Sequence, residues 1–349
     1  MTTPAVTAPL LQVEDLTVQF PTPDGLITVV DHVSFTLDAN RVLCIVGESG
    51  SGKSVTALSL VGLVQSRGGR VSAGSVKFRG TELVGQPEKA LNRIRGRDIG
   101  FIFQEPMSSL NPAFTVGDQI AEVVRRHRRA GRKEAWARAV EMLDRVGIAS
   151  AAQRAKDYPH RFSGGMRQRV MIALALACDP KLLIADEPTT ALDVTIQART
   201  LELLKTLQRE QDMAVLFITH DLGVVADIAD DVVVMYASQV VEHAPVRDLF
   251  RRPQHPYTAG LLAAMPQSAL ENGSPLVGIP GVVPQPHRLP SGCRFHPRCT
   301  HAQAGRCTSE PVELRRLDGG LVRCVRSEEL RDPAPVPGAP APIEGVAVQ

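Results

Sequence analysis

The sequence predicts an α/β fold, and two observations carry this prediction. The apolar run at residues 42–46 is typical of a buried strand, and it is followed by a glycine-rich loop and then by an apolar, helix-compatible run at residues 55–64. A second apolar run, residues 182–185, ends in the adjacent carboxylates Asp186 and Glu187. In α/β folds the polar groups at strand ends are the ones that meet a ligand.

The glycine-rich loop, residues 47–54, has the spacing G-x-x-x-x-G-K-[ST] of a phosphate-binding loop. Glycines let backbone N–H groups turn inward around a phosphate, and the helix that follows directs its positive end at the same anion. We expect Lys53 to reach the β- and γ-phosphates of ATP and Ser54 to ligate Mg²⁺. A turn that binds nothing is the alternative, and the strand–loop–helix context disfavours it. The ATP-binding residues expected here are Gly47, Ser49, Gly50, Gly52, Lys53 and Ser54.

Length and composition exclude several classes of protein. The 349 residues suffice for two domains, or for one domain with an extension. A net charge of +2 and an aromatic content of 4% give no case for nucleic-acid binding. No apolar run approaches the roughly 18–20 residues of a membrane span, and residues 1–9 lack the features of a signal peptide. We therefore expect a cytosolic protein that meets a membrane only through a partner.

The N-terminal region predicts a β-hairpin. Residues 13–20 have rough alternation, residues 22–25 carry a turn signal, and residues 26–30 form the expected second strand. A further strand is expected at residues 33–37. Phe20 lies upstream of the phosphate-binding loop, where it could stack on a purine ring or serve as a core residue.

Strands are next expected at residues 74–78 and 99–103, with a polar helix between them. Gln104 follows the second of these strands, where its amide could reach Mg²⁺ and the attacking water. Residues 115–155 predict helices, and the basic run at residues 125–129 is interpreted as a solvated helix face rather than a binding patch.

A second phosphate-binding turn is expected at Ser163, Gly164 and Gly165, directly ahead of a helix. The chain has one phosphate-binding loop but two such turns, and this suggests that the second turn serves the nucleotide of another subunit. Two strand ends then supply the remaining polar groups. Asp186 suits Mg²⁺ and Glu187 suits a general base, while His220, after the strand at residues 214–218, could contact the γ-phosphate.

Taken together and in this order, these motifs resemble the nucleotide-binding subunit of ABC transporters over about residues 10–250. The match departs slightly at Phe162 and Met166, which stand where the family usually has Leu and Gln. The resemblance implies a mixed-sheet core, an antiparallel β subdomain and a helical subdomain at about residues 105–178. It also implies an ATPase in which Glu187, His220 and Gln104 are catalytic, and in which two subunits enclose two ATP molecules.

A narrower resemblance covers the rest of the chain. Residues 107–112, 255–258 and 293–299 look like those of the oligopeptide/dipeptide (and nickel) importer ATPases. It implies an ATPase domain at residues 1–250 and an extension at residues 251–332, while composition predicts a disordered tail at residues 333–349. The implied partners are a second ATPase subunit, two membrane permeases and an extracytoplasmic peptide-binding protein. The expected location is the cytoplasmic face of the membrane.

Six cysteines fall into two groups. Cys44 and Cys178 lie in apolar runs and are expected in the core. The other four are Cys293, Cys299, Cys307 and Cys324, whose spacing matches neither a paired zinc motif nor a compact ferredoxin motif. Spacing therefore leaves a [4Fe–4S] cluster, zinc and free thiols open. Because some members of the resembled family carry a [4Fe–4S] cluster on a matching set, that resemblance favours the cluster, in a structural or redox-sensing role.

Two other classes of function are disfavoured by the sequence. A non-transport ABC ATPase for DNA repair would separate its two nucleotide motifs by hundreds of residues, and one for translation would carry two phosphate-binding loops; this chain has a short gap and one loop. A scaffold with a dead nucleotide site would lack catalytic positions, and all of them are filled. The sequence does not name the cargo, which could be dipeptide, oligopeptide, nickel or another solute. Nor does it say whether the two ATPase subunits are identical.

Overall fold

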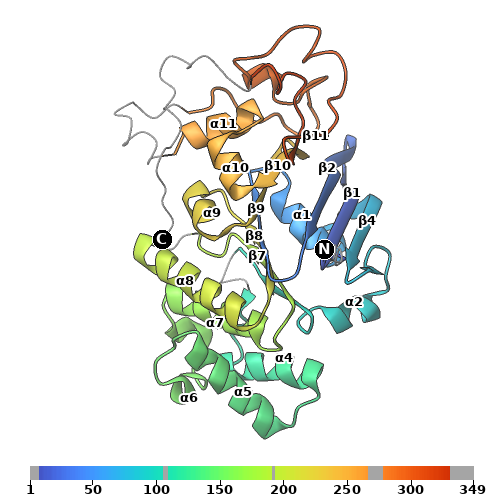
Figure 1. Cartoon of the computed structure of the whole chain (residues 1–349). Helices are drawn as coiled ribbons and strands as arrows, with labels where there is room; N and C mark the ends of the chain where they lie inside the picture. Colours follow the sequence, from blue (N-terminus) through green and yellow to red (C-terminus); the bar gives the residue numbers. More distant parts are fainter. Residues whose placement is uncertain (1–7, 105–108, 191–192, 266–277, 331–349) are drawn as a thin grey trace, which may run out of the picture.

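The computed structural model describes residues 8–104, 109–190, 193–265 and 278–330 (Figure 1). Three regions stack along its long axis. Helices lie at the bottom of the view, two sheets lie in the middle, and the C-terminal segment (residues 251–265 and 278–330) lies at the top. The predicted α/β fold, with a sheet core, an antiparallel β subdomain and a helical subdomain, is confirmed.

The larger sheet carries the strands that end at the candidate site. Its order is β11-β12-β10-β9-β3-β8-β7-β6, and the strands from β9 to β6 are parallel. Strands β7 and β8 are buried along their whole length, which explains why their sequences are apolar throughout rather than alternating. The strands of the parallel part are β3 (Val42–Val46), β6 (Ile99–Ile102), β7 (Leu182–Asp186), β8 (Ala214–Ile218) and β9 (Asp231–Tyr236).

The smaller sheet is antiparallel, with the order β2-β1-β4-β5. The expected hairpin is present, but the separate strand expected at residues 33–37 is wrong, because β2 runs without interruption past residue 30. Register shifts along β1 and a positive φ of 50° at His32 allow the long strand to continue. Its strands are β1 (Leu11–Thr22), β2 (Gly25–Leu37), β4 (Arg70–Phe78) and β5 (Thr81–Glu82). Helix α1 (Lys53–Leu60) contributes Ala57 and Leu60 to the core shared by the two sheets.

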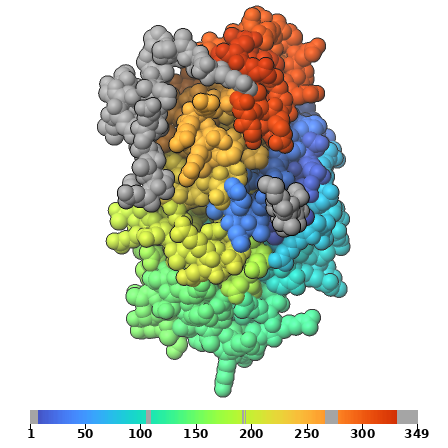
Figure 2. Space-filling view, in the orientation of Figure 1, coloured from blue at the N-terminus to red at the C-terminus, as the bar shows by residue number. Residues whose placement is uncertain are grey.

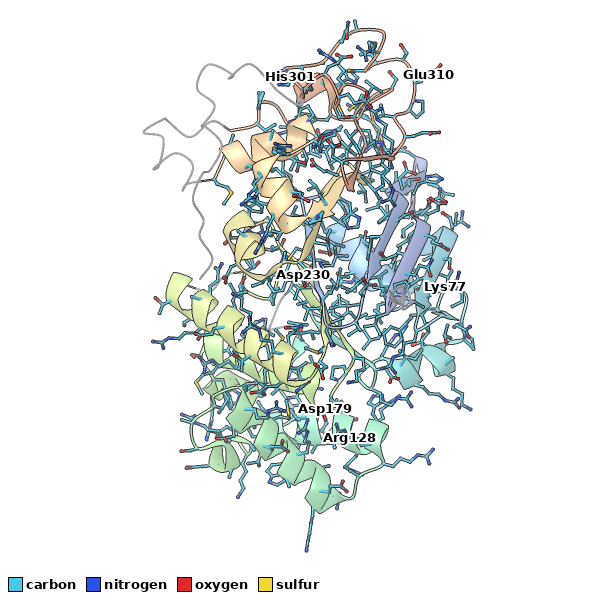
Figure 3. All side chains as sticks on the ribbon, viewed as in Figure 1. Lys77, Arg128, Asp179, Asp230, His301 and Glu310 are labelled. Atoms are coloured by element: carbon cyan, nitrogen blue, oxygen red, sulfur yellow. The ribbon has the colours of Figure 1, made fainter. Side chains whose placement is uncertain are left out.

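The helical region packs on the other side of the larger sheet. Its helices are α4 (Val116–Arg128), α5 (Arg132–Arg145), α6 (Ala151–Arg154) and α7 (Gly164–Leu176). Helix α2 (Glu88–Ile94) instead contributes Leu91 to the core that α1 shares with the two sheets. The basic run lies at the end of α4, where Arg125 and Arg126 are exposed and Arg128 forms an ion pair with Asp179 (Figure 3). This agrees with a solvated helix face.

The remaining helices are α8 (Val194–Glu210), α9 (Leu222–Ile228), α10 (Val246–Arg251) and α11 (Pro256–Ala263). The C-terminal segment then returns to the larger sheet. Strand β12 (Gly320–Val322) pairs antiparallel with β10 (Gln239–Pro245), and β11 (Arg315–Leu317) pairs with β12. Figure 2 shows this segment, in red, directly above the blue N-terminal part of the molecule. The C-terminal segment therefore adds two strands to the edge of the larger sheet.

The two cysteines outside the C-terminal segment lie where the sequence predicts them. Cys44 and Cys178 are 0% and 6% exposed, so both are core residues as expected. Within the described ranges, no helix combines the length and apolarity that a membrane span requires.

Candidate functional site

The phosphate-binding loop adopts a conformation that only glycine allows at two of its positions. Gly47 has a φ of 146°, and a Cβ there would lie 2.1 Å from the Met235 carbonyl oxygen. Gly52 has a φ of 100°, and a Cβ would lie 2.5 Å from the Val29 carbonyl oxygen. The loop is therefore fixed between β9 and β2 directly ahead of α1, as the motif predicts.

Lys53 is the buried cation of this loop. The residue is 6% exposed. Its ammonium donates to the carbonyl oxygens of Gly47 at 2.7 Å and Glu48 at 3.1 Å. Burial lowers its pKa, and the nearby carboxylates of Glu187 and Asp186 act in the opposite direction. The charge is thus held at the mouth of the loop by groups that a phosphate can replace.

Ser54 and Asp186 form the oxygen pair expected for Mg²⁺. The Ser54 hydroxyl donates to the Asp186 carboxylate at 2.9 Å, although the two residues are 132 positions apart. Asp186 is 5% exposed, and burial raises the pKa of its carboxyl, with the hydrogen bond from Ser54 acting against this. Hard oxygen donors are the ligands Mg²⁺ prefers, so this pair fits the ion.

Glu187 lies at the centre of a polar cluster at the end of β7. Its carboxylate accepts from the Gln104 amide at 3.1 Å and from the Thr190 hydroxyl at 2.8 Å, and it lies 3.3 Å from the His220 ring. Burial raises its pKa, but the hydrogen bonds from Thr190 and His220, together with the nearby charges of His220 and Lys53, lower the pKa overall. An ionised carboxylate is the state a general base requires.

The structure therefore brings Gln104, Asp186, Glu187 and His220 to one edge of the sheet, next to the loop that carries Lys53 and Ser54. Sequence reasoning missed Thr190, because a threonine in a short loop carries no signal of its own. It also missed Tyr257, whose hydroxyl accepts from the Glu48 N–H at 2.9 Å, and Arg298, whose guanidinium binds the Glu48 carboxylate. Both come from the C-terminal segment.

Phe20 and the turn at Ser163, Gly164 and Gly165 lie apart from this cluster. Phe20 is partly buried in β1 and packs against the core between the sheets, with its ring beside Gly69. Ser163 caps the N-terminus of α7, accepting from the Met166 N–H at 3.4 Å. Ser163 and Gly164 are exposed, whereas Gly165 is buried against Ile196. Ser163 and Gly164 are thus open to solvent at a helix N-terminus, the position expected for an anion site.

Two expectations and one loop fall partly or wholly outside the described residues. Residues 105–108, which include part of the stretch at 107–112, are not described. Residues 191 and 192 of the loop before α8 are not described either, whereas Asp193 caps that helix by accepting from the Ile196 N–H at 2.9 Å. The tail at residues 333–349 also lies outside the described ranges.

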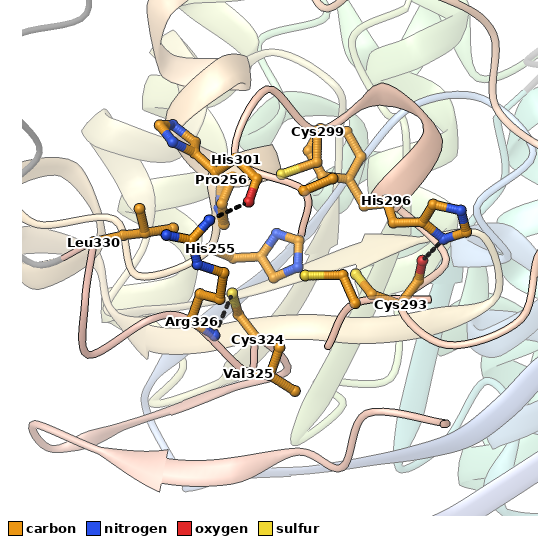
Figure 4. Close-up of a pocket in the computed structure, with 13 residues that line it drawn as sticks. His255, Pro256, Cys293, His296, Cys299, His301, Cys324, Val325, Arg326 and Leu330 are labelled. Carbon is orange, nitrogen blue, oxygen red and sulfur yellow. Dashed lines mark hydrogen bonds between the residues drawn. The ribbon is translucent and has the colours of Figure 1, made fainter. Parts of the chain in front are cut away.

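The four C-terminal cysteines line one cavity, shown in Figure 4. They are Cys293, Cys299, Cys307 and Cys324, none of which forms a disulfide. The cavity has a volume of about 20 Å³. Burial raises the pKa of Cys299 and of Cys324 to about 11. Among the residues the structure describes, no three His, Cys, Asp or Glu side chains are placed to hold a single metal ion.

Two family descriptions match this chain. The description "ABC transporter" matches residues 30–190, and "Oligopeptide/dipeptide transporter, C-terminal region" matches residues 241–307. The first match spans the phosphate-binding loop and the Asp186–Glu187 pair. The second spans the transition into the C-terminal segment and three of the four cysteines in the cavity.

Curated relatives are similar along nearly their whole length. The chain is 52% identical to the oligopeptide transport ATP-binding protein AppD of Bacillus subtilis, over 92% of this chain and 97% of that protein. It is 51% identical to a putative peptide import ATP-binding protein of Brucella melitensis, over 92% of this chain and 98% of that protein.

Solved structures resemble the ATP-binding part of the chain. A dimeric ATP-binding cassette in a post-hydrolysis state, bound to ADP and Pi, superposes with a TM-score of 0.62 at 27% identity, covering 68% of this chain and 99% of that one. The protein cbiO1 of Clostridium perfringens, part of an ABC transporter complex, superposes with a TM-score of 0.58 at 26% identity, covering 69% of this chain and 90% of that one.

Proposed function

Because this chain belongs to the ABC transporter family of ATP-binding proteins, we propose that it is the ATP-hydrolysing subunit that powers import of short peptides through a membrane ABC transporter. Two observations together carry the proposal. The chain is similar to a peptide-transport ATPase along nearly its whole length, and Gln104, Thr190 and His220 surround the Glu187 carboxylate. The chain acts at the cytoplasmic face of the membrane, where the permeases supply the membrane-spanning part.

The phosphates of ATP occupy the loop of Gly47–Ser54, where Lys53 exchanges its carbonyl partners for phosphate oxygens. Ser54 and Asp186, with the amide of Gln104, would hold Mg²⁺, which neutralises phosphate charge. Glu187 accepts the proton of the attacking water, and His220 contacts the γ-phosphate from the neighbouring strand end. Phe20 is proposed to contact the adenine from β1.

A second ATPase subunit completes each site. The Ser163–Gly165 turn presents a hydroxyl and helix N–H groups to solvent, away from the chain's own polar cluster, and it is proposed to bind the γ-phosphate held by the partner. Closure of the two subunits on ATP drives the permeases, and hydrolysis resets them. An extracytoplasmic peptide-binding protein delivers the cargo.

Peptide uptake tests the assignment in cells that lack this chain. Labelled di- and oligopeptides are supplied to cells complemented with wild type or with Glu187→Gln. We expect uptake with wild type alone. Unchanged peptide uptake in the deletion strain would contradict peptide import, and nickel uptake would then be measured as the alternative cargo. Recovery of the chain with ribosomes or nucleic acid rather than permeases would favour a non-transport ATPase.

We also propose that Cys293, Cys299, Cys307 and Cys324 would hold a [4Fe–4S] cluster in this cavity. Two features of the cavity support this. The thiols of Cys307 and Cys324 already accept backbone N–H groups at 3.4 Å, as cluster ligands do. Among the described residues, the buried Nε2 of His255, which lines the same cavity, has no hydrogen-bond partner.

Anaerobic purification followed by iron and sulfide assays tests the cluster. About four irons and four sulfides per chain are expected, and the Cys299→Ser variant should lose most of both. A colourless, iron-free wild type would refute the cluster, and bound zinc would replace it with a mononuclear site. The outcome leaves the ATPase assignment untouched, because ATP hydrolysis transfers no electrons.

A further inference from the structure

Glu48 is the second residue of the phosphate-binding loop, and its N–H, carbonyl oxygen and carboxylate all form hydrogen bonds. Its N–H donates to the Tyr257 hydroxyl at 2.9 Å, and its carbonyl oxygen accepts from Lys53 at 3.1 Å. Its carboxylate accepts two hydrogen bonds from the Arg298 guanidinium, at 2.7 and 3.1 Å. Two of these partners come from the C-terminal segment, more than 200 residues away in the sequence.

Arg298 is a buried residue with several hydrogen-bond partners. Its side chain is 4% exposed, and besides Glu48 it donates to the carbonyl oxygens of Pro280 at 2.7 Å and Ile279 at 3.3 Å. It also lies 3.5 Å from the Tyr236 hydroxyl. A bidentate guanidinium–carboxylate pair fixes orientation as well as distance. Removing the arginine would leave the Glu48 carboxylate and two carbonyl groups without this partner.

The same two residues adjoin the cysteine cavity. Arg298 directly precedes Cys299, and Tyr257 directly follows Pro256; both Cys299 and Pro256 line the cavity. The ring of Phe295, another lining residue, packs against Tyr257 with ring centroids 5.4 Å apart. The cavity and the phosphate-binding loop are therefore joined by a short, continuous set of packed side chains.

We propose that Arg298 and Tyr257 are positioning residues for the phosphate-binding loop, so that the affinity for Mg²⁺–ATP depends on the ordered C-terminal segment. The inference rests on the proposed ATP site. Loop residues that are already ordered lose less conformational freedom when phosphate binds, and this raises affinity. Neither residue touches the nucleotide; both act through Glu48.

The first experiment measures the dissociation constant of Mg²⁺–ATP for the full-length chain. Arg298→Ala should bind about tenfold more weakly, within the usual range of coupling between sites. Tyr257→Phe, which removes only the hydroxyl, should show a smaller loss in the same direction. Arg316→Ala is the matched control, since Arg316 is an exposed arginine in the same segment, and it should bind as wild type does.

A double-mutant cycle separates positioning from general destabilisation. Glu48→Gln should weaken binding as well, and adding Arg298→Ala to it should cost little more, because both changes break the same contact. If the losses of Mg²⁺–ATP affinity in the two single variants added fully in the double variant, Arg298 would not act through Glu48. Should Arg298→Ala fail to fold, Arg298→Lys and Tyr257→Phe carry the test, because both keep the bulk of the side chain.

The second experiment uses the reciprocity of coupled sites. In the Glu187→Gln background, which retains ATP, Mg²⁺–ATP should slow amide hydrogen exchange at residues 293–299 severalfold. Adding Arg298→Ala should abolish this slowing even at saturating ATP. Equal protection with and without Arg298, or wild-type affinity in a folded Arg298→Ala chain, would overturn the inference. Absence of ATP binding in wild type would instead overturn the proposed function.

Discussion

At the scale of single residues, Lys53 shows how a buried ammonium can remain free to bind a phosphate. Its ammonium donates to two loop carbonyls. Burial lowers its pKa, and the nearby carboxylates of Glu187 and Asp186 offset this only in part. Because these partners are weaker than a phosphate, the cation is ready to exchange them for one. The binding contribution of Lys53 should therefore be large.

Lys53→Ala should weaken binding of Mg²⁺–ATP by at least about tenfold, because it removes the charge that meets the β- and γ-phosphates. Calorimetric titration of the full-length chain measures this. Lys77→Ala is the matched control, since Lys77 forms an exposed ion pair with Glu14 at 3.6 Å on β4. An unchanged dissociation constant in Lys53→Ala would argue against the role of the loop.

Glu242 is a second buried charge, with no role in the ATP site. It is 1% exposed in β10 and accepts the N–H groups of Gln254 at 2.7 Å and His255 at 2.9 Å. Burial raises its pKa from 4.5 to about 7. Since the folded-state pKa lies above the unfolded one, the stability this proton brings is complete below about pH 4.5 and is lost as the pH rises through about 7.

Glu242→Gln should reduce the pH dependence of the free energy of unfolding between pH 5 and 8, by up to about 3 kcal/mol. Denaturant unfolding at several pH values, compared with wild type, measures the difference. Glu310→Gln, at an exposed position, serves as the control and should leave the pH profile unchanged. A wild-type profile in Glu242→Gln would show that this carboxyl does not titrate in the window.

At the scale of secondary structure, the strands around the site were predictable from the sequence. Strands β3, β7 and β8 are continuous apolar runs bounded by glycine or polar residues, because both faces of the parallel sheet are covered. The length of β2 was not predictable, since its bulges interrupt the alternation that marks a strand. Strands β11 and β12 were missed for another reason. Each has only three residues, too few for a periodic signal.

The pairing of β12 with β10 should stabilise the whole sheet. Val322→Ala removes two methyl groups at a position that is 0% exposed and should lower the free energy of unfolding by about 1–2 kcal/mol. Val282→Ala is the matched control, because Val282 lies in the same segment but is 85% exposed. Thermal unfolding of both variants measures the difference. Equal midpoints for the two variants would mean that β12 does not support the sheet.

At the scale of the whole molecule, the sequence predicted the residues of the site better than the connections between them. Asp186, Glu187, Gln104 and His220 were found because each follows an apolar run whose end faces the phosphate-binding loop. The contacts of Arg298 and Tyr257 with Glu48 were not found, because a single Arg or Tyr far along the chain carries no spacing signal. Long-range pairing of that kind becomes visible only in three dimensions.

The arrangement of the whole molecule also indicates that one chain is insufficient for the proposed cycle of ATP binding and hydrolysis. The chain has one phosphate-binding loop, and its Ser163–Gly165 turn is exposed at the N-terminus of α7 instead of joining the cluster around Glu187. A second subunit that supplies an equivalent turn completes the site. ATP hydrolysis should therefore be measured in the assembled transporter.

The most direct test of the account is ATP hydrolysis by the transporter reconstituted in lipid vesicles with its peptide-binding protein. Wild type should hydrolyse ATP faster when peptide is present and should accumulate peptide. Glu187→Gln should bind ATP normally but lose hydrolysis by about 100-fold or more, because the water loses its general base. Glu202→Gln, an exposed position on α8, should behave as wild type does. Undiminished hydrolysis in Glu187→Gln would contradict the central claim.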